Sequence, residues 1–271
     1  MIVVRGESVP PRTYTRMIER LCTVRACGAP LSLDGSRLSC VRNHSFDVAR
    51  SGYVNLLGPQ DRRSRDPGDS AAAVAARKRI HDSGMAAPLL AAVAHDLQAA
   101  ASDCVLDVGC GDGYFLGEIQ RQFRFEGEGL DISTPAVEVA ARSYPQCSWI
   151  VANADRFLPY ADASFSRLMS ITARMNPSEF RRVLRHNGRL LVAVPGPDDL
   201  IELRGEGKPR GDRTREEFAS LFTLLEQRAV RTSVAVDEQQ VADLRLSIYR
   251  PRGATPPRVT LSLDLLTFAP N

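Results

Sequence analysis

The chain has 271 residues, of which 44% are hydrophobic and 25% are charged, and its formal net charge is +3 at pH 7. This length suits one large domain, or one domain with a small appendage, and the hydrophobic content can bury a sizeable core. The mild net charge neither demands nor excludes a nucleic-acid partner. An apolar run of about 18 residues and a secretory h-region near the start are both absent, which argues against a membrane protein. We therefore expect a cytoplasmic protein with no membrane partner, whose six cysteines are reduced.

The first residues, 1–20, are polar and basic and are predicted to form an N-terminal extension. Two pairs of Cys and His residues follow, separated by a loop: Cys22 and Cys27, then Cys40 and His44. A structural zinc ion takes four tetrahedral nitrogen or sulfur ligands, usually from two such pairs. Residues 21–58 are too few to form a core of their own, so a metal would be their main source of stability. The pattern predicts a small zinc-ribbon module; three reduced cysteines and a surface histidine are the alternative.

Residues 59–83 are predicted to be a linker followed by a helix. The linker part, 59–69, is polar and contains proline and glycine. Three of its arginines could contact RNA phosphates, namely Arg62, Arg63 and Arg65. Aspartates are interleaved with them, so a solvated loop is an equally good interpretation.

Two helices are predicted around the end of this segment. Residues 70–76 are small and helix-prone, and Asp69 is the expected N-cap. Residues 86–101 carry leucines and a valine along one face. His81 and His95 are expected at the surface rather than at a ligand site.

The stretch from residue 104 to residue 114 is the most informative in the chain. A short apolar run, typical of a buried parallel strand, ends in glycines at two-residue spacing and leads into an amphipathic helix. Such a turn directs backbone N–H groups and a helix N-terminus at a ligand, and glycine lets the ligand approach without a Cβ in the way. Asp107 precedes Gly109, Gly111 and Gly113 in this pattern. A carboxylate there repels phosphate and suits a cation such as the amino group of an amino acid.

A second acidic residue defines the other half of the ligand. Asp131 ends another apolar run, eighteen residues after Gly113, where a carboxylate can accept both ribose hydroxyls of a nucleoside. An amino acid joined to adenosine is S-adenosylmethionine (SAM). The pattern resembles motif I and the following acidic residue of class I SAM-dependent methyltransferases. An ordinary glycine-rich βα turn is the alternative.

From Val105 onward strands and helices alternate, which predicts a parallel sheet of the Rossmann-like α/β type. Six strands are expected after the first: 125–131, 147–152, 165–171, 189–195, 229–236 and 258–268. The last is the expected antiparallel strand, and the total of seven is the number that the SAM-methyltransferase fold requires. Three connecting segments are also predicted: a helix stop at Asn187–Gly188, a mobile loop at 205–215 and an amphipathic segment at 216–227.

Asn153 and Asp155 follow the strand predicted at 147–152. In an open α/β sheet this edge faces the ligand crevice. Either side chain could therefore bind the adenine ring, and a simple turn is the alternative.

Three strings carry a resemblance to a known family: Gly52-Tyr-Val-Asn-Leu-Leu57, Arg63-Ser-Arg-Asp-Pro-Gly-Asp-Ser70 and Leu106-Asp-Val-Gly-Cys-Gly-Asp-Gly-Tyr114. Together with a zinc ribbon ahead of a SAM-type domain, they resemble the RlmA family of large-subunit (23S) ribosomal RNA guanine-N1 methyltransferases. The resemblance covers roughly residues 20–203. It implies a methyltransferase domain over 84–271, with SAM and Zn²⁺ as cofactors. It also implies a ribosomal RNA hairpin as partner, held by the ribbon and the linker, with a homodimer as one option.

The resemblance also implies a set of site residues. Those expected to contact SAM are Asp107, Gly109, Gly111, Gly113, Tyr114, Asp131, Ile132, Asn153, Ala154 and Asp155. Guanine N1 carries a proton that must leave during methyl transfer, and Asp155 is the candidate base. The guanine must be flipped or unpaired to reach the pocket.

Three positions depart from the family pattern. The first zinc pair is usually C-x2-C, but Val24 stands at the first of these positions and Cys22 must serve. Ala86 replaces an aromatic residue expected near SAM, and Arg174 stands where the family usually has proline. Two other functions therefore stay open, a non-catalytic RNA-binding protein and a small-molecule methyltransferase with a structural ribbon.

Overall fold

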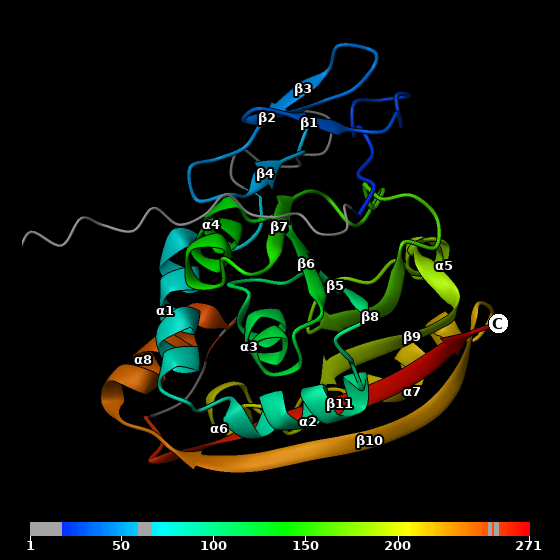
Figure 1. Cartoon of the computed structure of the whole chain (residues 1–271). Helices are drawn as coiled ribbons and strands as arrows, with labels where there is room; N and C mark the ends of the chain where they lie inside the picture. The colour runs from blue at the N-terminus through cyan, green and yellow to red at the C-terminus, as the bar shows by residue number, and fades with distance from the viewer. Residues whose placement is uncertain (1–17, 59–66, 249–250, 252–254) are drawn as a thin grey trace, which may run out of the picture.

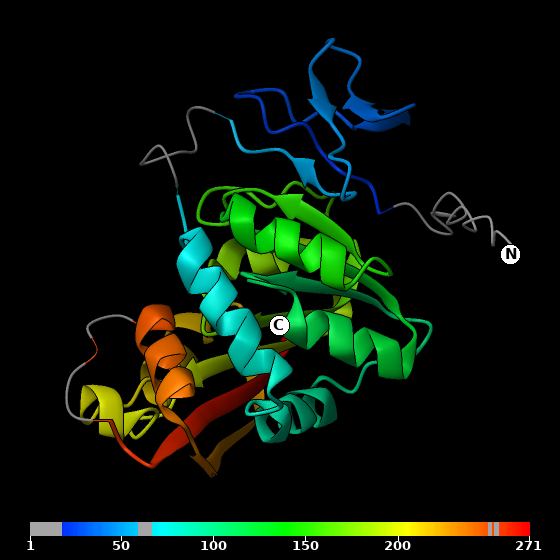
Figure 2. The ribbon, with the colours of Figure 1, turned by 90° about the vertical axis from the view of Figure 1, so that its left-hand side faces the viewer.

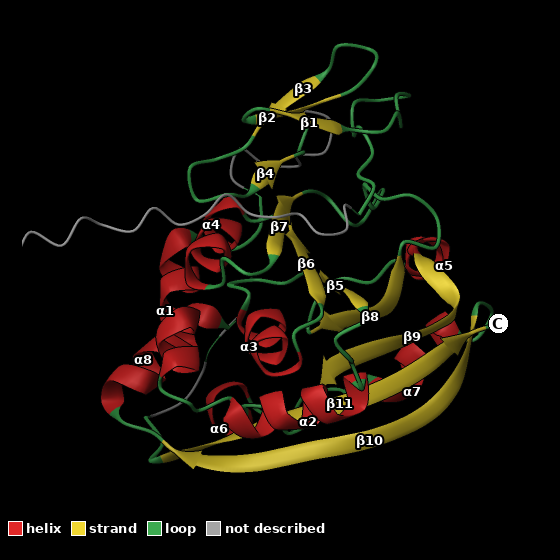
Figure 3. Ribbon diagram, in the orientation of Figure 1, coloured by secondary structure: helices red, strands yellow, loops and turns green. Residues whose placement is uncertain are grey.

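The computed structural model describes residues 18–58, 67–248, 251 and 255–271. The predicted N-terminal extension up to residue 17 and the predicted RNA contacts Arg62, Arg63 and Arg65 lie outside these residues. The described chain forms a small three-stranded sheet and a large eight-stranded sheet flanked by helices (Figure 1, Figure 3). None of its helices combines the length and the apolar character that a membrane span needs.

The small sheet is antiparallel and its strands are only three residues long: β1 (Ser32–Asp34), β2 (Arg37–Ser39) and β3 (Ser45–Asp47). All three side chains of β1 are exposed, and Leu38 is the buried residue of β2. Strands this short, with so little buried surface, cannot hold a fold by packing alone.

The large sheet has the spatial strand order β10-β11-β9-β8-β5-β6-β7-β4. Its strands are β4 (Val54–Asn55), β5 (Cys104–Val108), β6 (Glu126–Asp131), β7 (Ser148–Val151), β8 (Phe165–Ile171), β9 (Leu184–Pro195), β10 (Phe222–Ala235) and β11 (Arg258–Pro270). Neighbours pair in parallel, except that β11 runs antiparallel to both β9 and β10. The prediction of seven strands is corrected to eight, because the N-terminal module adds β4 beside β7.

The helices are α1 (Ala71–Asp82), α2 (Ala87–Leu97), α3 (Tyr114–Phe123), α4 (Thr134–Ser143), α5 (Pro177–Val183), α6 (Ile201–Arg204), α7 (Gly211–Phe218) and α8 (Glu238–Ser247). One buried cluster joins α2, α3, α4, α6 and α8 to one face of the sheet, and a second joins α5, α7 and the small sheet to the other. β5 shows why both clusters form: Val105 points into the first and Leu106 into the second. A strand that is buried on both sides needs the continuous apolar run seen in the sequence.

Several predicted boundaries move. The N-cap of α1 is Ser70, whose hydroxyl accepts from the Ala73 N–H, and not Asp69. Residues 187–188 lie within β9 and do not stop a helix. The amphipathic segment predicted at 216–227 divides between α7 and β10, and α8 was not predicted at all.

Candidate active site and metal centre

The predicted zinc ligands Cys22, Cys27, Cys40 and His44 converge, and their ligand atoms all lie within 4.8 Å of one another. His44 Nδ1 is 3.4 Å from Cys22 Sγ and 3.5 Å from Cys40 Sγ, while the Sγ atoms of Cys27 and Cys40 are 3.9 Å apart. With bonds of about 2.3 Å to sulfur and about 2.0 Å to nitrogen, a tetrahedral zinc ion places its ligand atoms about 3.5–3.8 Å apart. These three distances agree with a zinc site, and the donor set of three cysteines and one histidine is one that zinc accepts.

The backbone around Cys40 prepares it to act as a thiolate. Burial opposes ionisation, but N–H groups of Arg42 and His44 direct hydrogen bonds at the sulfur and lower the Cys40 pKa to about 7. Asn43, in the left-handed region with φ 62°, forms the tight turn that brings these amides round. A thiolate is the form in which cysteine binds metal.

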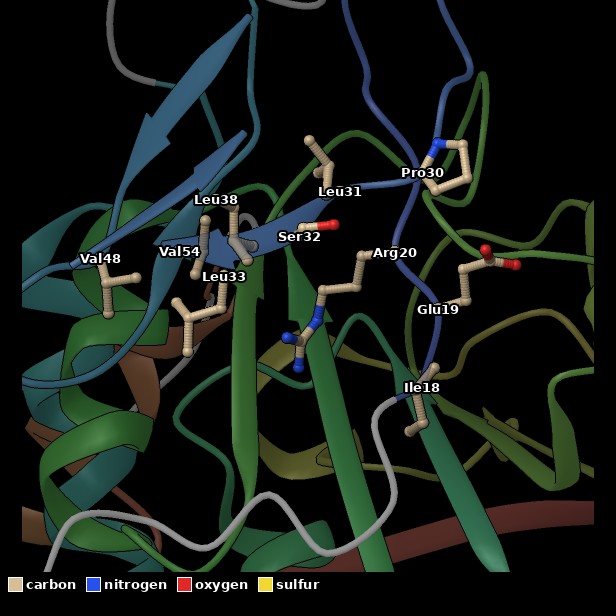
Figure 4. A pocket seen from close by; sticks show the side chains of 10 residues that line it. All are labelled: Ile18, Glu19, Arg20, Pro30, Leu31, Ser32, Leu33, Leu38, Val48 and Val54. Atoms are coloured by element: carbon tan, nitrogen blue, oxygen red, sulfur yellow. The ribbon is translucent and has the colours of Figure 1, made fainter. Parts of the chain in front are cut away.

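The metal module, residues 18–58, is joined to the rest of the chain by backbone pairing and by a buried ion pair. β4 pairs with β7 through Val54↔Ile150 and Asn55↔Val151. Arg20 donates two hydrogen bonds to Glu128 of β6, at 2.9 and 2.7 Å. The side chains of this ion pair are 11% and 1% exposed, so Arg20 neutralises a carboxylate that is almost completely removed from water. Figure 4 shows Arg20 among the residues that line a pocket of the module, together with apolar residues such as Leu33 and Val54.

The glycine turn after β5 has the conformation that its sequence predicts. Gly109, Gly111 and Gly113 have φ values of 81°, 54° and 80°, in the left-handed region that favours glycine. A Cβ on Gly109 would lie 2.2 Å from the Cβ of Ala173, and one on Gly113 would lie 2.6 Å from the Trp149 ring. The first and third glycines are therefore also fixed by close packing, and the Gly109 and Cys110 N–H groups donate to the Leu130 carbonyl at the end of β6.

Three carboxylates lie at this turn. Asp131 accepts hydrogen bonds from the Gly111 and Ser133 N–H groups at 2.9 and 2.8 Å. Asp107 is 2% exposed, and its Oδ1 has no hydrogen-bond partner among the described residues. Burial, reinforced by the charges of Asp131 and Asp112, raises the pKa of Asp107 well above its usual range.

These features fit SAM. An unpaired buried carboxylate oxygen is costly unless a donor meets it, and an ammonium group is such a donor. Asp131 is held in a fixed orientation at the end of β6, where a ribose would lie in an open α/β sheet. Ile132 and Tyr114 flank these residues, with Tyr114 buried at the start of α3 and Ile132 half-buried. The predicted SAM contacts at the ends of β5 and β6 are thus brought to one place.

The predicted adenine contacts lie at the next strand end. Asn153 and Ala154 are half-buried after β7, and Asn153 Oδ1 accepts from the Asp155 N–H at 3.0 Å. Asp155 is bound by Arg174 of the loop after β8, with Nη1 3.3 Å from Oδ2. Thr172, which precedes Arg174 in the loop after β8, has φ 52°. A β-branched residue in that region is strained, and such strain is concentrated at functional sites.

The prediction that His81 is a surface residue is wrong. Its side chain is 11% exposed, its ring stacks on Tyr114 at 4.2 Å, and its Nδ1 lies 2.8 Å from Asp112 Oδ2. Sequence reasoning missed this contact because its two residues lie 31 positions apart in the chain. His95 is at the surface as predicted, with 73% of its side chain exposed.

Comparison with known proteins agrees with this geometry. Residues 105–193 match a family model described as a methyltransferase domain, and residues 23–65 match one described as the N-terminal part of RlmA. The chain is 39% identical over 223 residues to a 23S rRNA (guanine(748)-N(1))-methyltransferase of Streptomyces fradiae, covering 78% of each chain. It is 36% identical over 198 residues to a putative 23S rRNA (guanine-N(1)-)-methyltransferase of Micromonospora griseorubida, covering 65% of this chain and 66% of that one.

A solved structure shows the same fold at low identity. It comes from the complex of the Haloferax volcanii Trm112 methyltransferase activator with a putative methyltransferase. The TM-score is 0.54 at 21% identity, with 77% of this chain and all of that chain covered.

Proposed function

Because this chain belongs to the RlmA family of 23S rRNA (guanine-N1)-methyltransferases, we propose that it transfers a methyl group from SAM to N1 of a guanine in 23S ribosomal RNA. The observation that carries the proposal is the presence, in one chain, of a complete Cys₃His site and of a glycine turn with the buried carboxylates Asp107 and Asp112. A ribosomal substrate also places the protein in the cytoplasm. Whether two copies assemble is a separate prediction, which light scattering of the purified protein would test.

We propose that the two parts of the chain have different functions. We assign residues 21–58 to RNA recognition and 84–271 to methyl transfer, with 59–83 between them. Several arginines of the module are exposed, among them Arg25, Arg42 and Arg50. Exposed arginines can bind RNA phosphates and so recognise the shape of a hairpin.

SAM supplies an activated methyl group, so the protein must mainly hold the acceptor nitrogen in line and exclude water. Asp107 and Asp131 would hold the two ends of the cofactor, and the half-buried turn at Asn153 and Ala154 would hold the adenine. Asp155 is our candidate to take the N1 proton, because it lies at the crevice in ionic contact with Arg174. The arginine holds the carboxylate in one orientation until the guanine enters.

The test is transfer of labelled methyl from SAM to unmodified 23S rRNA, with the product nucleoside identified by mass spectrometry. We expect 1-methylguanosine from the wild type and at least about a 100-fold lower rate from Asp155→Asn, in the range for loss of a general base. Asp162→Asn, an exposed carboxylate paired with Arg182, is the matched control and should keep its rate. RNA binding without transfer would instead support a non-catalytic RNA-binding protein, and transfer only to metabolites a small-molecule enzyme.

A further inference from the structure

Helix α1 is fixed across the loops that form the cofactor site. At its start, the Ser133 hydroxyl donates to the Asp69 carbonyl at 2.9 Å. Near its end, His81 contacts Asp112 of the glycine turn. Between these points Arg79 binds Asp243 of α8 with two hydrogen bonds, at 2.9 and 2.5 Å. α1 (cyan in Figure 2) therefore spans from the site to α8 and cannot move independently of the glycine turn.

One side chain of α1 faces the middle of that turn. Arg77 is four residues before His81, so the two lie on the same face of the helix. A Cβ built on Gly111 would lie 3.7 Å from Arg77 Nη1, and apart from its chain neighbours no other described residue has an atom within 4 Å of it. The positive charge also reaches Asp131: burial raises the Asp131 pKa, and Arg77 partly opposes this. Arg77 is thus the cation of α1 that lies against the cofactor turn.

The acidic residues around the turn cannot bind every group at the amino-acid end of SAM, and Arg77 can bind the remaining one. Asp107, Asp112 and Asp131 lie at this turn, and their carboxylates suit the ammonium group of a methionyl ligand. The same group carries an α-carboxylate, which these acids would repel. A guanidinium beside Gly111 can bind that carboxylate, since arginine matches carboxylates in a planar, two-point geometry.

The existing partner of Arg77 does not prevent this. Arg77 Nη1 is 2.6 Å from Asp69 Oδ2, but the Asp69 side chain is 47% exposed, and such pairs stabilise little. The guanidinium has five N–H donors, so one carboxylate does not use them all. The Arg77 side chain is 27% exposed, which leaves it accessible to a ligand.

We infer that Arg77 binds the α-carboxylate of SAM and of its product S-adenosylhomocysteine, and so makes the site select the complete amino-acid end of the ligand. The inference rests on the proposed SAM-dependent function. His81 acts as a positioning residue here, because its ring, held between Tyr114 and Asp112, fixes the turn of α1 that presents Arg77.

The test compares binding of S-adenosylhomocysteine with that of 5′-methylthioadenosine, which lacks the amino-acid end. By calorimetry, we expect Arg77→Met to weaken S-adenosylhomocysteine about 10- to 100-fold, the range for losing a hydrogen bond to a charged group. Binding of 5′-methylthioadenosine should change less than about twofold. Arg77→Lys keeps the charge and should fall between the wild type and Arg77→Met.

Lys78→Met is the matched control, because Lys78 is the adjacent cation on α1 and binds Asp82 of the same helix. It should leave both affinities unchanged. Equal losses for both ligands in Arg77→Met, or no loss for either, would overturn the role of Arg77 while leaving the proposed function intact. A wild type that binds neither ligand would overturn the proposed function and this inference with it.

Discussion

The metal module and the large sheet are stabilised in opposite ways. The module has three-residue strands that are mostly exposed, and four ligand atoms hold its ends together. The large sheet has two buried clusters in which Trp149, Phe165 and many other side chains are almost completely removed from water. One region therefore depends on a few atoms, and the other spreads its stability over many contacts. A single substitution should therefore cost much more folding stability at a metal ligand of the module than at one buried residue of the large sheet.

Removal of zinc should give the largest effect. Structural zinc contributes an apparent binding free energy of about 10–16 kcal/mol in small metal modules, far more than this module could gain from packing. We expect chelation, or Cys40→Ala, to unfold residues 21–53 while the large sheet stays folded. Metal analysis and hydrogen exchange would show this. Cys147→Ala removes a buried thiol of the sheet cluster and should leave one zinc per chain; simultaneous loss of protection in β5 and β8 would contradict the comparison.

Loss of the Arg20–Glu128 ion pair, which joins the module to the large sheet, should give the next largest loss of stability. Arg20→Met leaves Glu128 charged and buried without a partner, which costs about 3–5 kcal/mol of unfolding free energy. The double variant Arg20→Met/Glu128→Leu should recover most of the loss in urea denaturation. Arg37→Met breaks an exposed pair of the module, with side chains 64% and 79% exposed, and should cost no more than about 1 kcal/mol. Equal costs for the two arginines would show that burial does not matter at the joint.

Packing density offers a smaller test. A Cβ on Gly129 would lie 2.3 Å from the buried Trp149 ring, so Gly129→Ala should overpack the sheet and cost roughly 3 kcal/mol. Gly28 of the module has φ 59° and open space around it, so Gly28→Ala should meet only the left-handed penalty of about 1 kcal/mol. Hydrogen exchange, which reports the stability of each region separately, would rank them; a larger loss at Gly28 would reverse the comparison.

The smallest expected effect is on how the free energy of unfolding depends on pH. The Arg79 hydrogen bonds hold the pKa of Asp243 below its usual range. A depressed carboxyl pKa adds stability above the unfolded value of about 3.9, and that stability is lost as pH falls through the folded value. We expect Arg79→Met to flatten the decline of unfolding free energy between pH 5 and pH 3. Lys78→Met should keep the wild-type slope, and an identical slope in all three proteins would refute the assignment.

The features that could be predicted from the sequence are those determined by residues close together in the chain. The strand predicted at 165–171 is found with these bounds, because its buried apolar residues Phe165, Leu168 and Met169 mark it as a strand of the core. The zinc ligands and the glycine turn were equally readable, since ligand chemistry and left-handed backbone restrict the residue types. Such features are local in sequence.

The features that could not be predicted depend on contacts between residues far apart in the sequence. The two residues of β4 become a strand only by pairing with β7, almost one hundred residues away. His81 leaves the surface because Asp112 draws it inward, and no spacing rule links the two. By contrast, α8 was readable: Asp237 and Gln240 form a reciprocal capping box three residues apart.

The position of β11 has a consequence for how the protein is made. β11 is the last strand in the described chain, yet it lies between β9 and β10. It pairs with β10 over its whole length and with β9 from Leu263 to Phe268. During translation β10 therefore leaves the ribosome before it has a neighbour, and its fourteen residues wait for their partner. Until Pro270 has cleared the exit tunnel, the nascent chain exposes two strand edges, so this is the interval in which a chaperone would matter most.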